Sequence, residues 1–274
     1  MALKSYSMKG TPFVPQVAPA EGLLREYYRV LYAAFGRQHW WPARTRFEVI
    51  VGAYLTQNTA WTNVEKAMRK LRSAGVLNLD GIRNLSLERL ETLVRPAGYF
   101  RQKAQRLKTF VAFVDENYGG SLRRMFAQPT AKLREELLSL NGVGPETADS
   151  ILLYAGQHPV FVVDAYTRRV LHRHGILPAI ADYEDIRELF ERALNNKDLN
   201  ATCPEKIEAI PVQPHLPSAM SRAKRSSVAQ IYNDMHGLIV QTGKHFCFKR
   251  NPACPTCPLR DFLPKTMPFV QNPL

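Results

Sequence analysis

An aspartate at the end of an apolar run is the first residue that could do chemistry. Asp164 follows the sequence PVFVV at 159–163 and directly precedes a helical pattern at 165–174. A carboxylate in that position can cap the N-terminus of the helix through its side chain. It can also stabilise positive charge on a reacting carbon or orient an attacking water molecule. These residues alone leave both roles open.

A tight, glycine-rich turn lies twenty residues before this aspartate. The sequence LNGVG occupies 140–144, and Pro145 follows it. The glycines permit positive φ, and proline suits the first position of a helix because its missing N–H is not needed there. Backbone N–H groups at such a turn can bind a phosphate, so it could hold a nucleic-acid backbone without reading sequence. An ordinary turn between two helices is the alternative.

The composition indicates a globular protein that binds a polyanion. The 274 residues include 37 Lys and Arg against 24 Asp and Glu, a formal net charge of +13, and 45% are hydrophobic. A folded domain this basic typically binds nucleic acid, although the charge could serve only solubility. No apolar run is long enough to cross a bilayer, and the first twenty residues lack a signal-peptide pattern. We therefore expect a cytoplasmic protein, with no membrane partner and with reduced cysteines.

Apolar residues recur at helical spacing through most of the chain. Only PVFVV at 159–163 resembles a strand, and it has no obvious partner, so we predict an all-α fold. Residues 1–20 are predicted to form a flexible leader, and 197–226, with four prolines, an irregular insertion. The predicted helices begin at residue 23 and continue at 46–57, 62–73, 87–95, 100–116, 131–140, 146–155, 165–174, 183–194 and 227–243.

The hairpin and the aspartate together resemble the helix-hairpin-helix DNA glycosylase superfamily, in particular the endonuclease III group. FEVIVGAYLTQNT at 47–59 and VRPAGYFRQKAQRL at 94–107 extend the resemblance, which covers nearly the whole chain apart from the leader and the insertion. It implies the bilobed HhH-GPD glycosylase fold. One lobe would be a six-helix barrel, and the other would combine N- and C-terminal helices with a cysteine-rich loop; the corresponding ranges are 45–158 for the first lobe, 21–44 with 159–274 for the second, and 247–257 for the loop.

The resemblance also implies a partner, which is double-stranded DNA with a damaged base flipped out of the stack. Asp164 would then be the catalytic residue, and Gln57 would fill the space that the flipped base leaves. The protein would act as a monomer associated with the nucleoid. The hairpin would bind the DNA backbone, with a monovalent cation beside it, through Asn141, Gly142, Val143 and Gly144.

A single position separates two reaction types in this superfamily. Members that also nick the strand carry a lysine two residues after the last hairpin glycine, where this chain has Glu146. A Schiff base with the sugar requires an amine, which a carboxylate cannot supply. We therefore expect a monofunctional glycosylase, with a lysine from elsewhere in the chain as the alternative. Glu146 could also be no more than favourable charge in a first helical turn.

Tryptophans indicate the class of base. Trp41 and Trp61 resemble pocket residues of the 3-methyladenine glycosylases built on the endonuclease III scaffold. Alkylated purines are electron-poor or cationic, so stacking against indole faces would bind them well; burial in an ordinary core is the alternative. The glutamate of the adenine-mispair branch is missing, because Gly52 occupies its position and Glu48 lies one turn away.

Three cysteines are spaced as in an iron–sulfur loop. Cys247-x6-Cys254-x2-Cys257 matches the endonuclease III pattern for a [4Fe–4S] cluster, but Leu263 stands where the fourth cysteine is expected. Cys203 is the remaining cysteine and our predicted fourth ligand. His245, Asp261 or an exogenous group, zinc instead of iron, and loss of the metal are the alternatives. The cluster would hold two basic residues against phosphates, although these could be merely solvated; they are Lys249 and Arg250.

These features favour a base-excision-repair glycosylase that hydrolyses the bond to an alkylated purine such as 3-methyladenine. One alternative is a glycosylase with lyase activity that acts on oxidised or mismatched pyrimidines. Another is a non-catalytic DNA-binding protein, which would need neither Asp164 nor Gln57.

Overall fold

The computed structural model describes residues 17–195, 199 and 216–264. Every regular element in these residues is helical, which confirms the predicted all-α class. None of these helices combines the length and apolar character that a membrane span requires. The α-helices are α1 (Val17–Phe35), α2 (Arg46–Thr56), α3 (Trp61–Ser73), α4 (Leu79–Asn84), α5 (Leu87–Val94), α6 (Phe100–Tyr118), α7 (Leu122–Met125), α8 (Thr130–Leu138), α9 (Pro145–Ser150), α10 (Ala165–Arg173), α11 (Tyr183–Leu194) and α12 (Ser227–His245).

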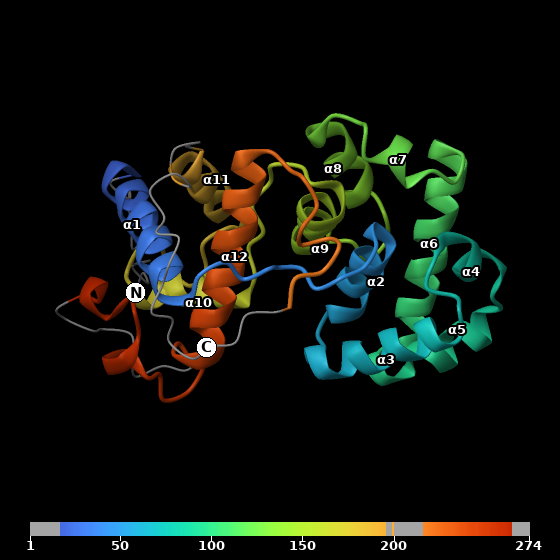
Figure 1. Ribbon diagram of the computed structural model, residues 1–274, viewed down its shortest axis with the longest axis horizontal. Coiled ribbons are helices and arrows are strands. Elements are labelled where there is room, and N and C mark those ends of the chain that lie inside the picture. Colours follow the sequence, from blue (N-terminus) through green and yellow to red (C-terminus); the bar gives the residue numbers. More distant parts are fainter. Residues whose placement is uncertain (1–16, 196–198, 200–215, 265–274) are drawn as a thin grey trace, which may run out of the picture.

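The helices pack in two groups (Figure 1). Helices α2, α4, α5 and α7 contact α6, α3 packs on α2 and α5, and α8 packs on α9, whereas α1, α10 and α11 surround α12. The turn of π-helix at Ile151–Gly156, which continues α9, packs against both α2 and α12 and so joins the groups. Our division into lobes at 45–158 and at 21–44 with 159–274 stays a prediction, although the contacts follow a similar division.

Two sequence-based boundaries differ from the structure, and two short helices were not predicted. The predicted leader ended at residue 20, but α1 begins at Val17, because VAPAEGLL continues the apolar pattern past Pro19. The predicted helix at 146–155 is α-helical only to Ser150 and then widens into the π-helical turn. Helices α4 and α7 are too short for their apolar periodicity to be recognised.

Part of the predicted irregular insertion supports the tryptophan segment. Its residues 199 and 216–226 are described, and the rest of 197–226 lies outside the described residues. The Met220 N–H donates to the carbonyl of Ala43 at 3.1 Å, and the Ser218 hydroxyl donates to that of Trp41 at 3.2 Å. These bonds fix the chain where it enters the first group of helices.

The run at 159–163 is extended but pairs with no strand in the described part of the chain. The side chains of residues 160–163 are buried, so the backbone N–H groups there need partners other than water. The Phe161 N–H donates to Glu191 Oε1 at 2.9 Å, and the Val163 N–H donates to the Tyr183 hydroxyl at 3.3 Å. Side chains of α11 therefore replace a neighbouring strand and carry the chain straight to Asp164.

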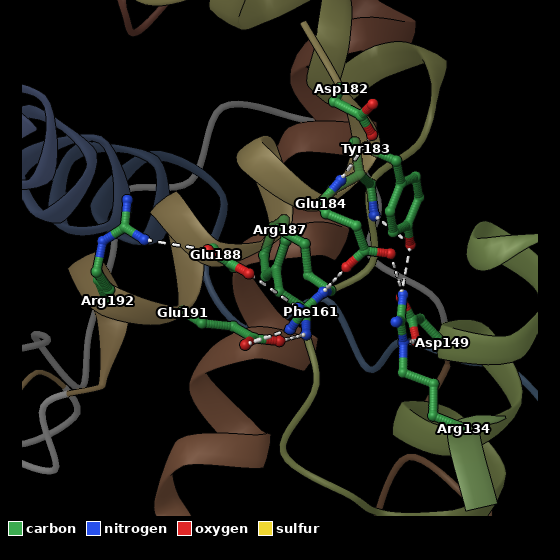
Figure 2. A network of polar contacts seen from close by, with 11 residues as sticks. Arg134, Asp149, Phe161, Asp182, Tyr183, Glu184, Arg187, Glu188, Glu191 and Arg192 are labelled. Atoms are coloured by element: carbon green, nitrogen blue, oxygen red, sulfur yellow. Dashed lines mark hydrogen bonds and ion pairs between the residues drawn. The ribbon is translucent and has the colours of Figure 1, made fainter. Parts of the chain in front are cut away.

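An ion-pair network connects helix α11 to α8 and α9, the two helices on either side of the glycine-rich hairpin (Figure 2). Arg134 of α8 binds Asp149 of α9 through two hydrogen bonds of 2.7 and 3.1 Å, and its Nη2 lies 2.6 Å from Glu184. The Tyr183 hydroxyl donates to Asp149 at 3.0 Å. Arg187 continues the network along α11 by pairing with Glu184 at 2.7 Å. Because Asp149 is fully buried, its charge depends on these partners.

We expect Arg134→Met to destabilise the protein by about 3 kcal/mol, since it leaves the buried Asp149 carboxylate unpaired. Urea unfolding followed by circular dichroism measures this loss. The matched control is Arg192→Met, which removes an arginine from exposed pairs with Glu21 and Glu188 and should cost less than about 1 kcal/mol. Equal losses for the two variants would contradict the importance that we assign to the buried pair.

Candidate active site

A cleft of about 790 Å³ lies between the two groups of helices. Its volume is in the range of ligand sites. Its walls come from five places: the tryptophan segment, the end of α2 with the following loop, the start of α9, the segment around Asp164, and α12. The residues on which the argument depends are Trp41, Gln57, Trp61, Glu146, Asp164, His236 and Lys244.

Asp164 divides its two carboxylate oxygens between two tasks. It is the N-cap of α10, where Oδ1 accepts hydrogen bonds from the Thr167 N–H at 2.8 Å and the Thr167 hydroxyl at 3.0 Å. Oδ2 lies 3.6 Å from His236 Nε2, a second residue that lines the cleft. The capping role is therefore present, and it leaves the second oxygen free to act on a bound molecule.

The pKa values of two carboxyl groups in the cleft, those of Asp164 and Glu146, shift in opposite directions. Burial alone would raise the pKa of Asp164, but the contacts with His236 and Thr167 outweigh it and lower the pKa. Burial of its carboxyl group, followed by the charge of Asp164, raises the pKa of Glu146 to about 7, but the residue as a whole is exposed, so solvent screens this shift. Asp164 therefore stays ionised more readily than Glu146.

Aromatic rings form another part of the cleft wall. Trp41 is 7% exposed, and its ring lies edge-on to Trp61 with centroids 5.2 Å apart. It also contacts the ring of Tyr154 at 5.3 Å. Trp61 is half-buried, and its indole N–H donates to Glu65 at 2.8 Å. Both predicted pocket tryptophans therefore line the cleft, and Trp41 also belongs to the hydrophobic core.

Gly52 makes room for the Trp41 ring. A Cβ atom on Gly52 would lie 3.1 Å from Trp41 Cζ2, which is closer than normal packing allows. A glutamate at this position would displace the indole. Glu48 does not replace it, because it is buried at the start of α2, where it binds the Arg44 N–H at 2.7 Å and Arg72 at 3.2 Å.

Gln57 links the end of α2 to the hairpin. Its Nε2 donates to the Gly142 carbonyl and to the Thr147 hydroxyl, both at 2.9 Å, and its Oε1 accepts from Arg106 at 2.7 Å. Gly142 has φ of +79°, and a Cβ there would lie 2.0 Å from Arg106 Nε. Glycine is thus required both for the turn and for the approach of the arginine.

A buried lysine fixes the loop between Gln57 and Trp61. Lys103 is 1% exposed, and its Nζ donates at 2.8 Å to the Leu55 carbonyl, the Thr59 hydroxyl and the Ala97 carbonyl. All three N–H groups of the ammonium therefore have acceptors. This arrangement sets the direction in which the chain enters α3 and so the position of Trp61.

The other predicted DNA-binding residues occupy two places. In the hairpin, Asn141 and Gly144 are exposed and Val143 is buried. Lys249 and Arg250 are exposed in the cysteine loop and are not among the residues that line the cleft. The Lys249 carbonyl accepts a hydrogen bond from Arg173 at 3.0 Å, so the loop is attached to the end of α10.

Comparison with known proteins identifies the family. The model described as HhH-GPD superfamily base excision DNA repair protein matches residues 51–196. This chain belongs to that superfamily. A Methanocaldococcus jannaschii protein, provisionally named a DNA repair glycosylase, is 42% identical over 241 residues, 88% of this chain and 95% of the relative. Endonuclease III of Sulfolobus acidocaldarius is 24% identical over 251 residues, 91% and 96% of the two chains. The protein is therefore a DNA glycosylase of base excision repair, as we predicted.

Solved structures agree with the predicted fold. The Helicobacter pylori 3-methyladenine DNA glycosylase bound to 1,N6-ethenoadenine superposes with a TM-score of 0.64 at 30% identity, over 82% of this chain and 97% of that one. A non-covalent complex of endonuclease III with DNA has the same TM-score at 20% identity, over 91% and 96%. The bilobed HhH-GPD fold is confirmed.

The three cysteines of the C-terminal loop of this glycosylase surround one small cavity. Cys247 and Cys257 are buried and Cys254 is half-buried, and Leu263 lines the same cavity without offering a ligand. His174 also lines it, but its Nδ1 is 2.6 Å from the Tyr27 hydroxyl. Within the described residues, no group of three His, Cys, Asp or Glu is placed to hold a metal ion. The described donors alone thus do not fit a cluster with four protein ligands; Cys203 lies outside the described residues.

Sequence reasoning missed several residues of the cleft. His236 and Lys244 are eight residues apart on α12, and Arg106 lies on α6. Tyr154, in the π-helical turn, does not line the cleft but contacts two residues that do, Trp41 and His236. Each belongs to a helical pattern that gives no sign of chemistry, and only packing brings them to Asp164 or to the hairpin.

We expect Gly52→Leu to destabilise this glycosylase by about 1–3 kcal/mol, because the new side chain overlaps the Trp41 ring in a packed core. Urea unfolding measures the loss, and tryptophan fluorescence should change with it. Gly22→Leu is the control, because a Cβ there meets no atom closer than 4.0 Å. An unchanged fluorescence spectrum in Gly52→Leu would contradict the close contact.

Proposed function

We propose that this glycosylase is monofunctional and releases alkylated purines, such as 3-methyladenine, from double-stranded DNA. The observation that carries the proposal is the combination of the Trp41 and Trp61 rings with two carboxyl groups in one cleft. Indole faces bind electron-poor or cationic bases, and nearby carboxylates complement the positive charge. The name of the H. pylori neighbour, a 3-methyladenine glycosylase, supports the same class of base.

In the proposed reaction, the damaged base leaves the stack and enters the cleft. The glycosidic bond breaks, its electron pair goes to the base, and positive charge develops at the sugar C1′. The Oδ2 oxygen of Asp164 stabilises that charge while Oδ1 keeps the carboxylate in place as the N-cap. Water then attacks C1′ and loses a proton to solvent, which leaves an abasic site. Because an alkylated base is already a good leaving group, stacking and charge suffice without a strong acid.

The proposed lack of strand cleavage is inferred from the residue at position 146, a glutamate. It stands where lyase members have their lysine, and a carboxylate forms no Schiff base. Lys244 is the lysine among the described residues that line the cleft, with Nζ 5.7 Å from the Trp40 ring centroid. It is therefore the amine that a glycosylase with lyase activity, acting on oxidised or mismatched pyrimidines, would use.

DNA would be held at the hairpin and by the basic loop. We assign backbone contacts to the exposed Asn141 and Gly144 with their neighbours Gly142 and Val143, and further phosphate contacts to Lys249 and Arg250. Gln57 would leave its hairpin partners to fill the gap in the duplex. A monovalent cation beside the hairpin, a monomeric protein and a location at the nucleoid complete the proposal.

We expect Asp164→Asn to lower base release from methylated duplex DNA at least about 100-fold with little change in stability, since asparagine is an equally good N-cap. Chromatography identifies the free base, and a denaturing gel shows whether the strand is nicked. The wild type should release 3-methyladenine, leave the strand intact and form no complex that borohydride traps. Trapping that disappears in Lys244→Met would instead establish the lyase alternative.

We also propose a [4Fe–4S] cluster held by Cys247, Cys254, Cys257 and Cys203. The purified protein should contain about four iron and four sulfide per chain, and Cys203→Ser should lose the cluster and its visible absorption. If the purified protein contains zinc and no sulfide, the metal is zinc and not an iron–sulfur cluster. If Cys203→Ser keeps a full cluster, the fourth ligand is a group other than Cys203.

A further inference from the structure

Within the described residues, a buried histidine beside Asp164 has one ring nitrogen without a hydrogen-bond partner. His236 is 5% exposed, and its Nε2 lies 3.6 Å from Asp164 Oδ2, just beyond hydrogen-bond distance. In the described part of the chain this Nε2 has no other polar partner. A buried polar atom without a partner destabilises a protein, so its position facing the carboxylate suggests a function.

The other ring nitrogen is held by a tyrosine. The Tyr154 hydroxyl lies 2.7 Å from His236 Nδ1, and Tyr154 is 1% exposed. Burial raises the pKa of Tyr154 well above its usual value, so its hydroxyl keeps its proton at neutral pH and can donate it to Nδ1. When the hydroxyl donates, the neutral imidazole must carry its own proton on Nε2. The N–H group then faces Asp164.

We propose that His236 is a positioning residue for Asp164, and that Tyr154 fixes the ring tautomer in which Nε2–H points at Oδ2. This inference rests on the proposed glycosylase function. Thr167 holds one carboxylate oxygen, and the Nε2–H of His236 faces the other from 3.6 Å. In the substrate complex this contact would tighten into a hydrogen bond, as catalytic hydrogen bonds often do, and would fix the carboxylate plane at both ends.

A second buried histidine gives a matched control. His158 is 9% exposed, and its Nδ1 lies 2.9 Å from the Thr130 hydroxyl. Its ring lies 6.3 Å from that of Phe126, whose backbone also contacts it, and it is not among the residues that line the cleft. His158 is thus a buried histidine held by a hydroxyl, like His236, but it faces a backbone group instead of a carboxylate.

Substitution of His236 by glutamine or asparagine separates the contact of Nε2 with Asp164 from the contact of Nδ1 with Tyr154. The glutamine amide nitrogen reaches the place of Nε2, whereas the asparagine amide reaches only the place of Nδ1. We expect His236→Gln to keep most of the single-turnover rate of base release. His236→Asn should lose about 10- to 100-fold, the effect of one hydrogen bond to a charged group. Tyr154→Phe should fall between them, and binding of DNA with an uncleavable abasic-site analogue should change little in any variant.

Several outcomes would overturn the inference. Equal rates for His236→Gln and His236→Asn would show that the Nε2 contact has no role, and a similar loss in His158→Asn would show a general effect of a buried histidine. Nitrogen-15 NMR of the wild-type histidine rings tests the tautomer without any variant: Nε2 of His236 should be protonated and Nδ1 should be an acceptor, and the reverse assignment would contradict us. Lack of base release by the wild type would disprove the glycosylase proposal itself, whereas the NMR result would stand independently.

Discussion

The ion pair between Arg134 and Asp149 is the interaction on which the cleft depends. It lies where α8, α9 and α11 meet, and through Tyr183 and Glu184 it fixes α11 relative to the hairpin. Helix α11 in turn supplies the side chains that bind the extended segment before Asp164. A buried pair of this kind contributes little net stability. Its contribution here is to keep the hairpin and Asp164 in one fixed relationship.

Several groups in the cleft serve two purposes. One oxygen of Asp164 caps α10 and the other faces the cleft. Trp41 is part of the core and also part of the cleft wall, and Gly52 makes both roles compatible by leaving space for the ring. A protein that uses structural residues in this way obtains a rigid site, because each side chain is already held by packing before DNA arrives.

The contacts of Gln57 link the cleft to the hairpin. This residue binds the hairpin and Arg106 at the same time. In the role proposed for it, Gln57 would exchange those bonds for bonds to bases and would free the Gly142 carbonyl. That role would couple the binding of DNA to a rearrangement of the hairpin.

The sequence by itself determined the features that depend on local pattern. Apolar periodicity predicted an all-α protein, the glycine-rich turn and Asp164 indicated the superfamily, and the place of Glu146 and the departure at Leu263 were visible at once. These features could be predicted because turns, caps and motif spacings are encoded by neighbouring residues. The shortest helices, the start of α1 and the π-helical turn could not, since their patterns are too brief or are overridden by packing.

Only the tertiary structure decided which distant side chains meet. His236 lies 72 positions after Asp164, and Gln57 and Gly142 are 85 positions apart. Nothing in the local sequence of α12 marks His236 as different from its buried neighbours, and the tautomer of its ring depends on Tyr154 from another element. The physical reason is that a hydrogen bond depends on distance and direction in space, which packing of whole helices sets, whereas the sequence records only the order of residues along the chain.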